Sequence, residues 1–215
     1  MDTCYCKINS LWKRDLKGKV LQGEFSLPEF EYLQDNEWIW TEKIDGTNIR
    51  LIWDGTTVTF GGRTDNAQIP AKLVSHLREH WGDPELWDAA FPNASPDAPV
   101  AVYGEGYGAG IQKAGILYRA DQGFIAFDVR VGPWWLSREG LQDVAGKIHC
   151  GVVPVVMRGD TNDAEVWVAE PHAIEGVEFS APLPEKVEGL VGVPAVPLFA
   201  RNGDRIIVKI KRADL

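Results

Sequence analysis

Residues 38–53 read WIWTEKIDGTNIRLIW: an apolar, aromatic run that leads into a lysine and a tight turn, and then into a second apolar run. Aromatic and β-branched residues favour strands, and Asp-Gly favours a turn. The stretch therefore predicts two strands joined by a turn, with Lys43 at the end of the first strand. A neutral lysine amine is a nucleophile. Taken alone, the pattern K-x-D-G also fits an ordinary β-turn with a surface lysine.

The rest of the chain is mostly strand-like. Apolar runs bounded by turn residues predict strands over TTVTFGG (56–62), APVAVYGEG (98–106), GFIAFDVRV (123–131), GVVPVVMRG (151–159) and DRIIVKIK (204–211). The pair Asn202-Gly203 predicts a hairpin turn between residues 196–201 and the last of these strands. We therefore expect an α+β protein with mostly antiparallel sheets and a few flanking helices.

Two helices and one long loop are predicted. Pro70 precedes apolar residues at helical spacing, from Leu73 to Trp81, with Gly82 after them. Ser137 fits the N-cap of a second helix that runs to about Ile148. Residues 91–99, FPNASPDAP, read as a loop.

Composition limits the class of protein. The chain has 215 residues, which fits one domain or a main domain with a small appendage. Its formal net charge of -9 argues against nucleic-acid binding over the whole surface but leaves room for a local basic groove. Basic residues cluster near both ends: Lys13, Arg14, Lys17 and Lys19, and Arg205, Lys209, Lys211 and Arg212. Either cluster also fits an ordinary solvated face.

The cysteines and the hydropathy pattern suggest a cytoplasmic protein. The three cysteines, Cys4, Cys6 and Cys150, form no disulfide framework and no zinc motif, so we expect reduced thiols. The sequence has neither a membrane-spanning apolar run nor an apolar signal-peptide core. It also lacks a Rossmann fingerprint, a P-loop and a nucleophile-elbow serine. Glycine alternates at positions 104, 106, 108 and 110, which suggests a structural turn.

Several further features could carry chemistry. Lys209 and Lys211 alternate on one strand, so both side chains share a face and could bind phosphates, although an exposed edge strand also carries lysines. Glu105 and Glu188 each precede a glycine at an expected strand end or turn, where carboxylates could serve Mg²⁺ or a ribose hydroxyl, or simply close a turn. Phe127 could stack on a flat base or pack in the core.

The chain contains a series of short motifs in this order: K-I-D-G-T-N, R-T, G-E, F-x-A-F-D, E-G-L-V and V-K-I-K. Together they resemble the motifs of the covalent nucleotidyltransferase superfamily of ligases and capping enzymes. The stretch E-K-I-D-G-T-N resembles the phage ATP-dependent RNA ligases that seal nicks in duplex RNA. The resemblance implies a single nucleotidyltransferase (adenylation) domain of ATP-grasp-like ligase type over residues 1–215, with no C-terminal OB-fold or helical domain. A helper protein could take the place of that missing domain.

The same resemblance implies roles for individual residues. Lys43 would attack the α-phosphate of ATP and become a lysyl–AMP adduct, and Lys209 and Lys211 would bind that phosphate and assist departure of pyrophosphate. Glu188 would bind the nucleotide and the metal, Mg²⁺ or Mn²⁺, with Glu175 as a rival for this role. The other nucleotide-binding residues would be Glu42, Ile44, Asn48, Arg63, Glu105 and Phe127.

The implied reaction passes AMP from Lys43 to a 5′-phosphate end, after which a 3′-hydroxyl seals the break and releases AMP. RNA is the favoured acceptor. At the position of Asp45, nick-sealing RNA ligases often carry histidine, whereas DNA ligases carry aspartate. A minimal DNA ligase is therefore an alternative. A capping guanylyltransferase and a non-catalytic nucleotide-binding module of the same fold are further alternatives. The implied location is cytoplasmic, in the host if the chain is phage-encoded, and the implied role is RNA repair.

Overall fold

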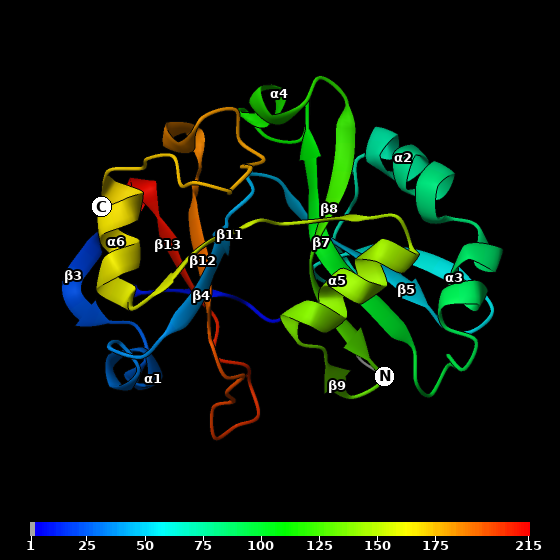
Figure 1. The fold of residues 1–215 in the computed structure, drawn as a ribbon, viewed down its shortest axis with the longest axis horizontal. Coiled ribbons are helices and arrows are strands. Elements are labelled where there is room, and N and C mark those ends of the chain that lie inside the picture. The colour runs from blue at the N-terminus through cyan, green and yellow to red at the C-terminus, as the bar shows by residue number, and fades with distance from the viewer. Residues whose placement is uncertain (1–2) are drawn as a thin grey trace. The chain divides into compact units, whose positions relative to one another are not determined.

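The computed structural model describes residues 3–215, which fall into two compact units (Figure 1). Unit 1 consists of residues 3–5 and Asp45–Val153, and unit 2 of Cys6–Ile44 and Pro154–Leu215. The chain passes from unit 2 to unit 1 directly after Ile44, and returns at Pro154. One nucleotidyltransferase domain over the whole chain stays a prediction.

Unit 1 is built on a six-stranded sheet. Its strand order is β10-β8-β7-β5-β6, with β9 paired to β8, and every pairing is antiparallel except that of β10 with β8. The strands are β5 (Thr47–Trp53), β6 (Val58–Gly62), β7 (Val100–Gly108), β8 (Gln122–Val131), β9 (Trp134–Trp135) and β10 (Gly151–Val152).

One face of this sheet is covered by helices. The core of unit 1 joins apolar residues of β5, β7 and β8 to α2 (Ala71–Trp81), α3 (Pro84–Ala90) and α5 (Arg138–Lys147), while α4 (Gly115–Tyr118) follows β7. Gly104 and Gly106 face this core, because a Cβ on them would lie 2.4 Å from the Phe124 ring and 2.4 Å from Leu73. Since side chains alternate along a strand, Tyr103 and Glu105 belong to the opposite face.

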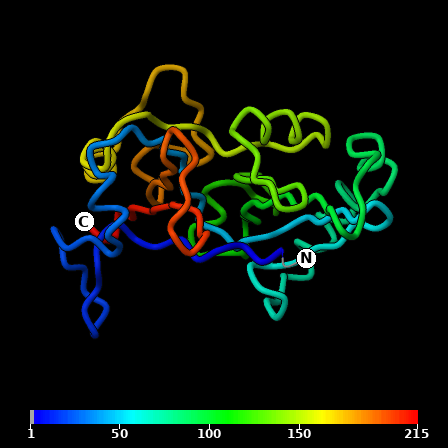
Figure 2. The backbone as a smooth tube through the Cα atoms, turned by 90° about the horizontal axis from the view of Figure 1, so that it is seen from below, coloured from blue at the N-terminus to red at the C-terminus, as the bar shows by residue number. Residues whose placement is uncertain are grey.

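Unit 2 holds a five-stranded sheet in the order β1-β13-β12-β4-β11, and a separate pair, β2 with β3 (Figures 1 and 2). Only β1 with β13 is a parallel pairing in the five-stranded sheet. Its elements are β1 (Asn9–Ser10), β2 (Trp12–Arg14), β3 (Val20–Phe25), α1 (Pro28–Tyr32), β4 (Trp38–Glu42), β11 (Val155–Gly159), α6 (Thr161–Ala169), η1 (Pro184–Lys186), β12 (Gly189–Pro194), β13 (Val208–Lys211) and η2 (Arg212–Asp214).

Tryptophans of β4 fill the core of unit 2. Trp38 and Trp40 are fully buried, and their rings stack with centroids 5.8 Å apart. The Trp38 indole N–H donates to the carbonyl of Leu33 at 2.9 Å, which satisfies its polar atom. On β12, Gly192 leaves the room that the Trp40 ring occupies, since a Cβ there would lie 2.4 Å from the ring.

The sequence predictions of the fold are largely confirmed. The α+β class, the mostly antiparallel sheets and both predicted helices are present, and the Ser137 hydroxyl caps α5 by accepting from the Gly140 N–H. The turn at residues 202–203 is present too, with Gly203 at a φ of 88°. Its flanks meet in a single bridge between Phe199 and Arg205. In the part of the chain that the structure describes, no helix is long and apolar enough to cross a bilayer.

Three expectations about the elements were wrong. Residues 151–159 do not form one strand, because Pro154 lacks an N–H and separates β10 in unit 1 from β11 in unit 2. Helices α3 and α6 were not predicted, although Asp160 at the N-cap of α6 and Asp163 in its first turn accept from each other's backbone N–H groups in a capping box. Glu105 lies inside β7, not at a strand end, and the glycines around it serve packing.

We predict that Gly192→Ala destabilises the protein by about 1–3 kcal/mol, because the new methyl group overlaps the buried Trp40 ring. Chemical denaturation of both proteins measures the change. Gly146→Ala is the matched control. Nothing lies within 4 Å of a Cβ at Gly146 on helix α5, so this variant should be neutral or slightly stabilising. Equal stability of the Gly192→Ala variant and the wild type would contradict the packing argument.

Candidate functional site

Three strands of unit 2 bring Lys43 next to residues far away in the sequence. The Lys43 N–H donates to the carbonyl of Gly189 at 3.0 Å, which continues the antiparallel pairing of β4 with β12 by one residue. On the other side of β12, Gly189 pairs with Lys211 of β13. Gly189 is therefore level with both lysines, and Glu188, one residue before it, lies at the ends of β4 and β13.

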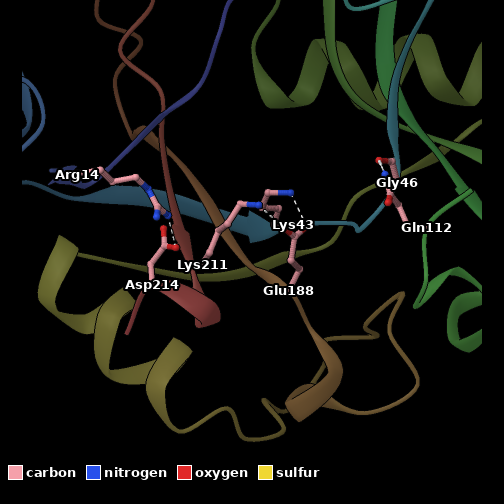
Figure 3. Close-up of polar contacts among 7 residues, drawn as sticks. All are labelled: Arg14, Lys43, Gly46, Gln112, Glu188, Lys211 and Asp214. Atoms are coloured by element: carbon pink, nitrogen blue, oxygen red, sulfur yellow. Dashed lines mark hydrogen bonds and ion pairs between the residues drawn. The ribbon is translucent and has the colours of Figure 1, made fainter. Parts of the chain in front are cut away.

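The Glu188 carboxylate bridges these two lysines (Figure 3). Its Oε2 lies 2.5 Å from the Nζ of Lys43, and its Oε1 lies 2.6 Å from the Nζ of Lys211. Burial opposes the charged carboxylate, but the two lysines outweigh burial and hold the pKa of Glu188 below its ordinary value. Glu175, the rival in sequence, is exposed in the loop that follows α6.

Lys209 adds a third cation to this cluster. It lies two residues before Lys211 on β13, and so on the same face of the strand. Burial lowers its pKa first, and the charges of Lys211 and Lys43 lower it further, while Glu188 acts in the opposite direction. Three lysines around one carboxylate leave a net positive charge, which suits a phosphate-bearing ligand. We call Lys43, Glu188, Lys209 and Lys211 the lysine cluster.

Glu42 and Ile44, on either side of Lys43, are both buried. The Glu42 carboxylate accepts from the backbone N–H groups of Ser180 at 2.6 Å and Ala181 at 2.8 Å. Burial raises the pKa of Glu42 more than these hydrogen bonds lower it. The side chain thus fastens the loop between α6 and Glu188 to the end of β4, and both of its oxygens are already engaged.

The turn after Lys43 belongs to unit 1 and is tightly packed. A Cβ on Gly46 would lie 2.3 Å from the carbonyl oxygen of Gly106, so only glycine fits there. The side chain of Gln112 donates to the Gly46 carbonyl at 3.1 Å (Figure 3). These contacts fix the backbone just beyond Lys43, at the start of β5.

The other predicted nucleotide-binding residues lie on unit 1. Asn48 and Glu105 are direct neighbours on β5 and β7. The Oδ1 of Asn48 is buried without a hydrogen-bond partner among the described residues, which makes it a candidate ligand contact. Phe127 lies where the register of β7 and β8 shifts, with its ring 5.1 Å from that of Tyr5. Arg63 follows β6 directly and is exposed.

Sequence reasoning missed Arg50, a buried arginine on β5 that is 2% exposed. It forms an ion pair with Asp65, and its Nη1 donates to the Thr3 hydroxyl at 3.0 Å. The pair holds the segment after β6, which carries Arg63, against the sheet. A charged residue in the otherwise apolar run IRLIW was the available signal.

Sequence reasoning also missed the aromatic support of Phe127. The Tyr5 ring lies 5.0 Å from that of Tyr103 and 5.8 Å from that of Trp135, and its hydroxyl donates to Asp128 Oδ2 at 2.9 Å. Nothing in the sequence links Tyr5 to β8, since 123 residues separate it from Asp128.

The N-terminal basic cluster is partly paired within unit 2. Arg14 forms an ion pair with Asp214 of η2 (Figure 3), and Lys13 lies 4.0 Å from Glu24. Lys17 and Lys19 are exposed. The cluster lies on β2 and in the turn that leads to β3, and two of its four members already have carboxylate partners.

Comparison with known protein families identifies the family. A model described as RNA ligase matches residues 36–211, which include the whole lysine cluster. The chain belongs to the RNA ligase family. The expected resemblance is therefore confirmed at the level of the family. No protein with a curated description matches the chain.

Solved structures of Naegleria gruberi RNA ligase have a similar fold. A mutant with ATP and Mn matches at 18% identity and a TM-score of 0.62, over 98% of this chain and 57% of that chain. The enzyme with PPi matches at 18% identity and a TM-score of 0.60, over 96% and 61%. An apo mutant matches at 19% identity and a TM-score of 0.60, over 86% and 52%. The chain thus spans only about half to three-fifths of the length of these structures.

We predict that Glu188→Gln lowers stability near neutral pH by about 1–3 kcal/mol, because it leaves three lysines without a compensating charge. A depressed pKa stabilises the fold above the ordinary value of 4.5, and this stabilisation is lost as the pH falls through the folded-state pKa. Urea denaturation should therefore show that the variant is less stable than the wild type near neutral pH, and that the difference is smaller below pH 4.5. Exposed Glu175→Gln should match the wild type throughout, and a deficit independent of pH would refute the electrostatic origin.

Proposed function

We propose that this chain is an ATP-dependent RNA ligase in which Lys43 carries AMP. The observation that carries the proposal is the lysine cluster: an amine at a strand end, paired with a half-buried carboxylate and flanked by two further lysines. Structures of N. gruberi RNA ligase hold ATP and Mn, AMP and Mn, or PPi, which supports the nucleotide, the metal and the leaving group of this scheme.

Lys43 is the nucleophile in this proposal. Its amino group is engaged by Glu188 at 2.5 Å, so it must pass a proton to water and leave the carboxylate before its lone pair can attack. The Nζ then forms a bond to the α-phosphorus of ATP. The bond between that phosphorus and the bridging oxygen to the β-phosphate breaks, and pyrophosphate takes the electron pair.

Lys209 and Lys211 are placed to bind the phosphates. They share one face of β13, and both contribute positive charge beside Lys43. Charge that develops on the phosphoryl oxygens and on the departing pyrophosphate is stabilised by cations already in position. Glu188 offsets part of this positive charge until the nucleotide arrives.

Glu188 also fits as the protein ligand of a divalent metal. Mg²⁺ keeps several waters and is bound by one or two carboxylates together with substrate phosphates, so a single carboxylate suffices. Within residues 3–215, no group of three or more His, Cys, Asp or Glu side chains could form an all-protein metal site. When bound, the metal neutralises phosphate charge, and Glu188 would exchange its lysine partners for it.

The remaining contacts come from the residues that the resemblance assigned. Glu105 would accept from a ribose hydroxyl, Phe127 would stack on adenine, and Arg63 would bind the ribose or a phosphate. The unpartnered Oδ1 of Asn48 offers a further contact. Glu42 and Ile44 contribute by fixing the backbone on either side of Lys43, because both side chains are buried.

The adduct then serves ligation. A 5′-phosphate end accepts AMP and releases Lys43, and a 3′-hydroxyl attacks that end and expels AMP. RNA is the proposed acceptor on the strength of the family, and a helper protein or further domain could hold the substrate. The sealing steps are separate from adduct formation and need their own test.

We predict that incubation with labelled ATP and Mg²⁺ produces an adduct of AMP mass on the protein, detected by denaturing gel and intact mass. Lys43→Ala should abolish it, since the accepting amine is gone. Lys186→Ala, which removes an exposed lysine two residues before Glu188, should label like the wild type. Protein freed of bound AMP that still forms no adduct would refute the proposal, and labelling by GTP alone would indicate a guanylyltransferase.

We further predict that the adenylylated protein seals nicks with RNA 3′-hydroxyl ends at least tenfold faster than nicks with DNA ends, a difference of about 1.4 kcal/mol in the barrier. Gel assays on duplexes that differ only in the terminal sugar measure the ratio. A preference for DNA ends would identify the protein as a minimal DNA ligase and leave the adduct chemistry unchanged.

A further inference from the structure

A second cationic region lies in unit 2 beside β1, outside the lysine cluster. It is a cavity of about 540 Å³, which we call the hairpin groove. Three segments line it: residues 6–9, the start of α1 and residues 200–207. Its lining residues are Cys6, Lys7, Asn9, Leu27, Glu29, Phe30, Ala200, Arg201, Asn202, Asp204, Arg205, Ile206 and Ile207.

Cations outnumber carboxylates in the lining. The lining holds three cationic residues, Lys7, Arg201 and Arg205, and two carboxylates, Glu29 and Asp204. One of these carboxylates is engaged within the turn, because the side-chain amide of Asn202 donates to Asp204 Oδ2 at 2.7 Å. In a chain with a net charge of -9, this local excess of positive charge marks a surface suited to an anion.

Strands β1 and β13 connect the groove lining with the lysine cluster. β1 runs parallel to β13, and Asn9 and Ser10 pair with Val208 and Lys209. Lys7 therefore precedes the strand that flanks Lys209, and its charge contributes to the lowered pKa of Lys209. A polyanion with one end at the lysine cluster would reach Lys7 and the groove by following β1 and β13.

An exposed aromatic residue, Phe199, forms an isolated β-bridge with the lining residue Arg205. The turn segment 196–206 extends beyond the end of β12 (Figure 1). Phe199, next to the lining residue Ala200, is 54% exposed. Exposed aromatic rings beside a cationic groove are the usual elements of single-strand nucleic-acid binding, where phosphates contact the cations and bases stack on the rings.

We propose that the hairpin groove binds the RNA strand that leads away from the reacting end. Its phosphates would contact Lys7, Arg201 and Arg205, and one base would stack on Phe199. This inference rests on the proposed ligase function, since it is the reacting 5′-phosphate that would place the strand end at the lysine cluster.

The test measures binding of a short 5′-phosphorylated, fluorescently labelled RNA by anisotropy over a range of salt concentrations. Lys7→Ala with Arg201→Ala should weaken binding about tenfold and reduce the slope of log affinity against log salt by about 0.7 for each lost phosphate contact. Lys17→Ala with Lys19→Ala is the matched control, because it removes two exposed charges from the same unit. Its affinity and slope should stay close to those of the wild type.

A second variant tests the ring. Phe199→Ala should weaken RNA binding, and Phe199→Tyr should restore it, because tyrosine also offers a stacking face. AMP adduct formation should remain at the wild-type level in both Phe199 variants. Equal weakening by the groove and control pairs, or unchanged binding by the groove pair, would overturn the proposal. Failure of the wild type to form the AMP adduct would instead refute the ligase function. The binding assay does not measure adduct formation, so the two outcomes are distinguishable.

Discussion

The ion pairs of Glu188 with Lys43 and Lys211 depend on one structural constraint, the hydrogen bonding of β12 between β4 and β13. Because Gly189 accepts from the Lys43 backbone and pairs with Lys211, the preceding carboxylate lies between two amines that are 168 positions apart in the chain. A shift of the β12 register by one residue would move each of its side chains to the opposite face of the sheet. The buried tryptophans of β4 and the close fit of Gly192 against Trp40 oppose such a shift.

The electrostatics of the cluster follow from this arrangement. Lysines held together at half-buried positions repel each other, and a single carboxylate compensates only part of that repulsion. A ligand with several negative charges relieves the remainder. An acidic chain can therefore offer a cationic site, because the charge that acts on a ligand is local, whereas the net charge of -9 is a sum over the whole chain.

Backbone-directed contacts support the residues around Lys43. The Glu42 carboxylate accepts hydrogen bonds from two backbone N–H groups of the loop that leads to Glu188. The Gln112 side chain donates to the carbonyl of Gly46 in the turn after Lys43. In the sequence, Glu42 is predicted to bind the nucleotide by resemblance to the family. Its hydrogen-bond partners show that it also shapes the backbone next to Lys43.

The sequence by itself determined the strands, the helices over 71–81 and 138–147, and the lysine-centred motif, because alternation, helical spacing and turn residues are local properties. The preference for Glu188 over Glu175 came from the resemblance to the family and stays a prediction. The sequence did not reveal the break at Pro154 between two sheets, the clamp of Arg50 on Asp65, or the contact of Tyr5 with Asp128. Those features join segments distant in sequence, and only tertiary packing decides which segments meet.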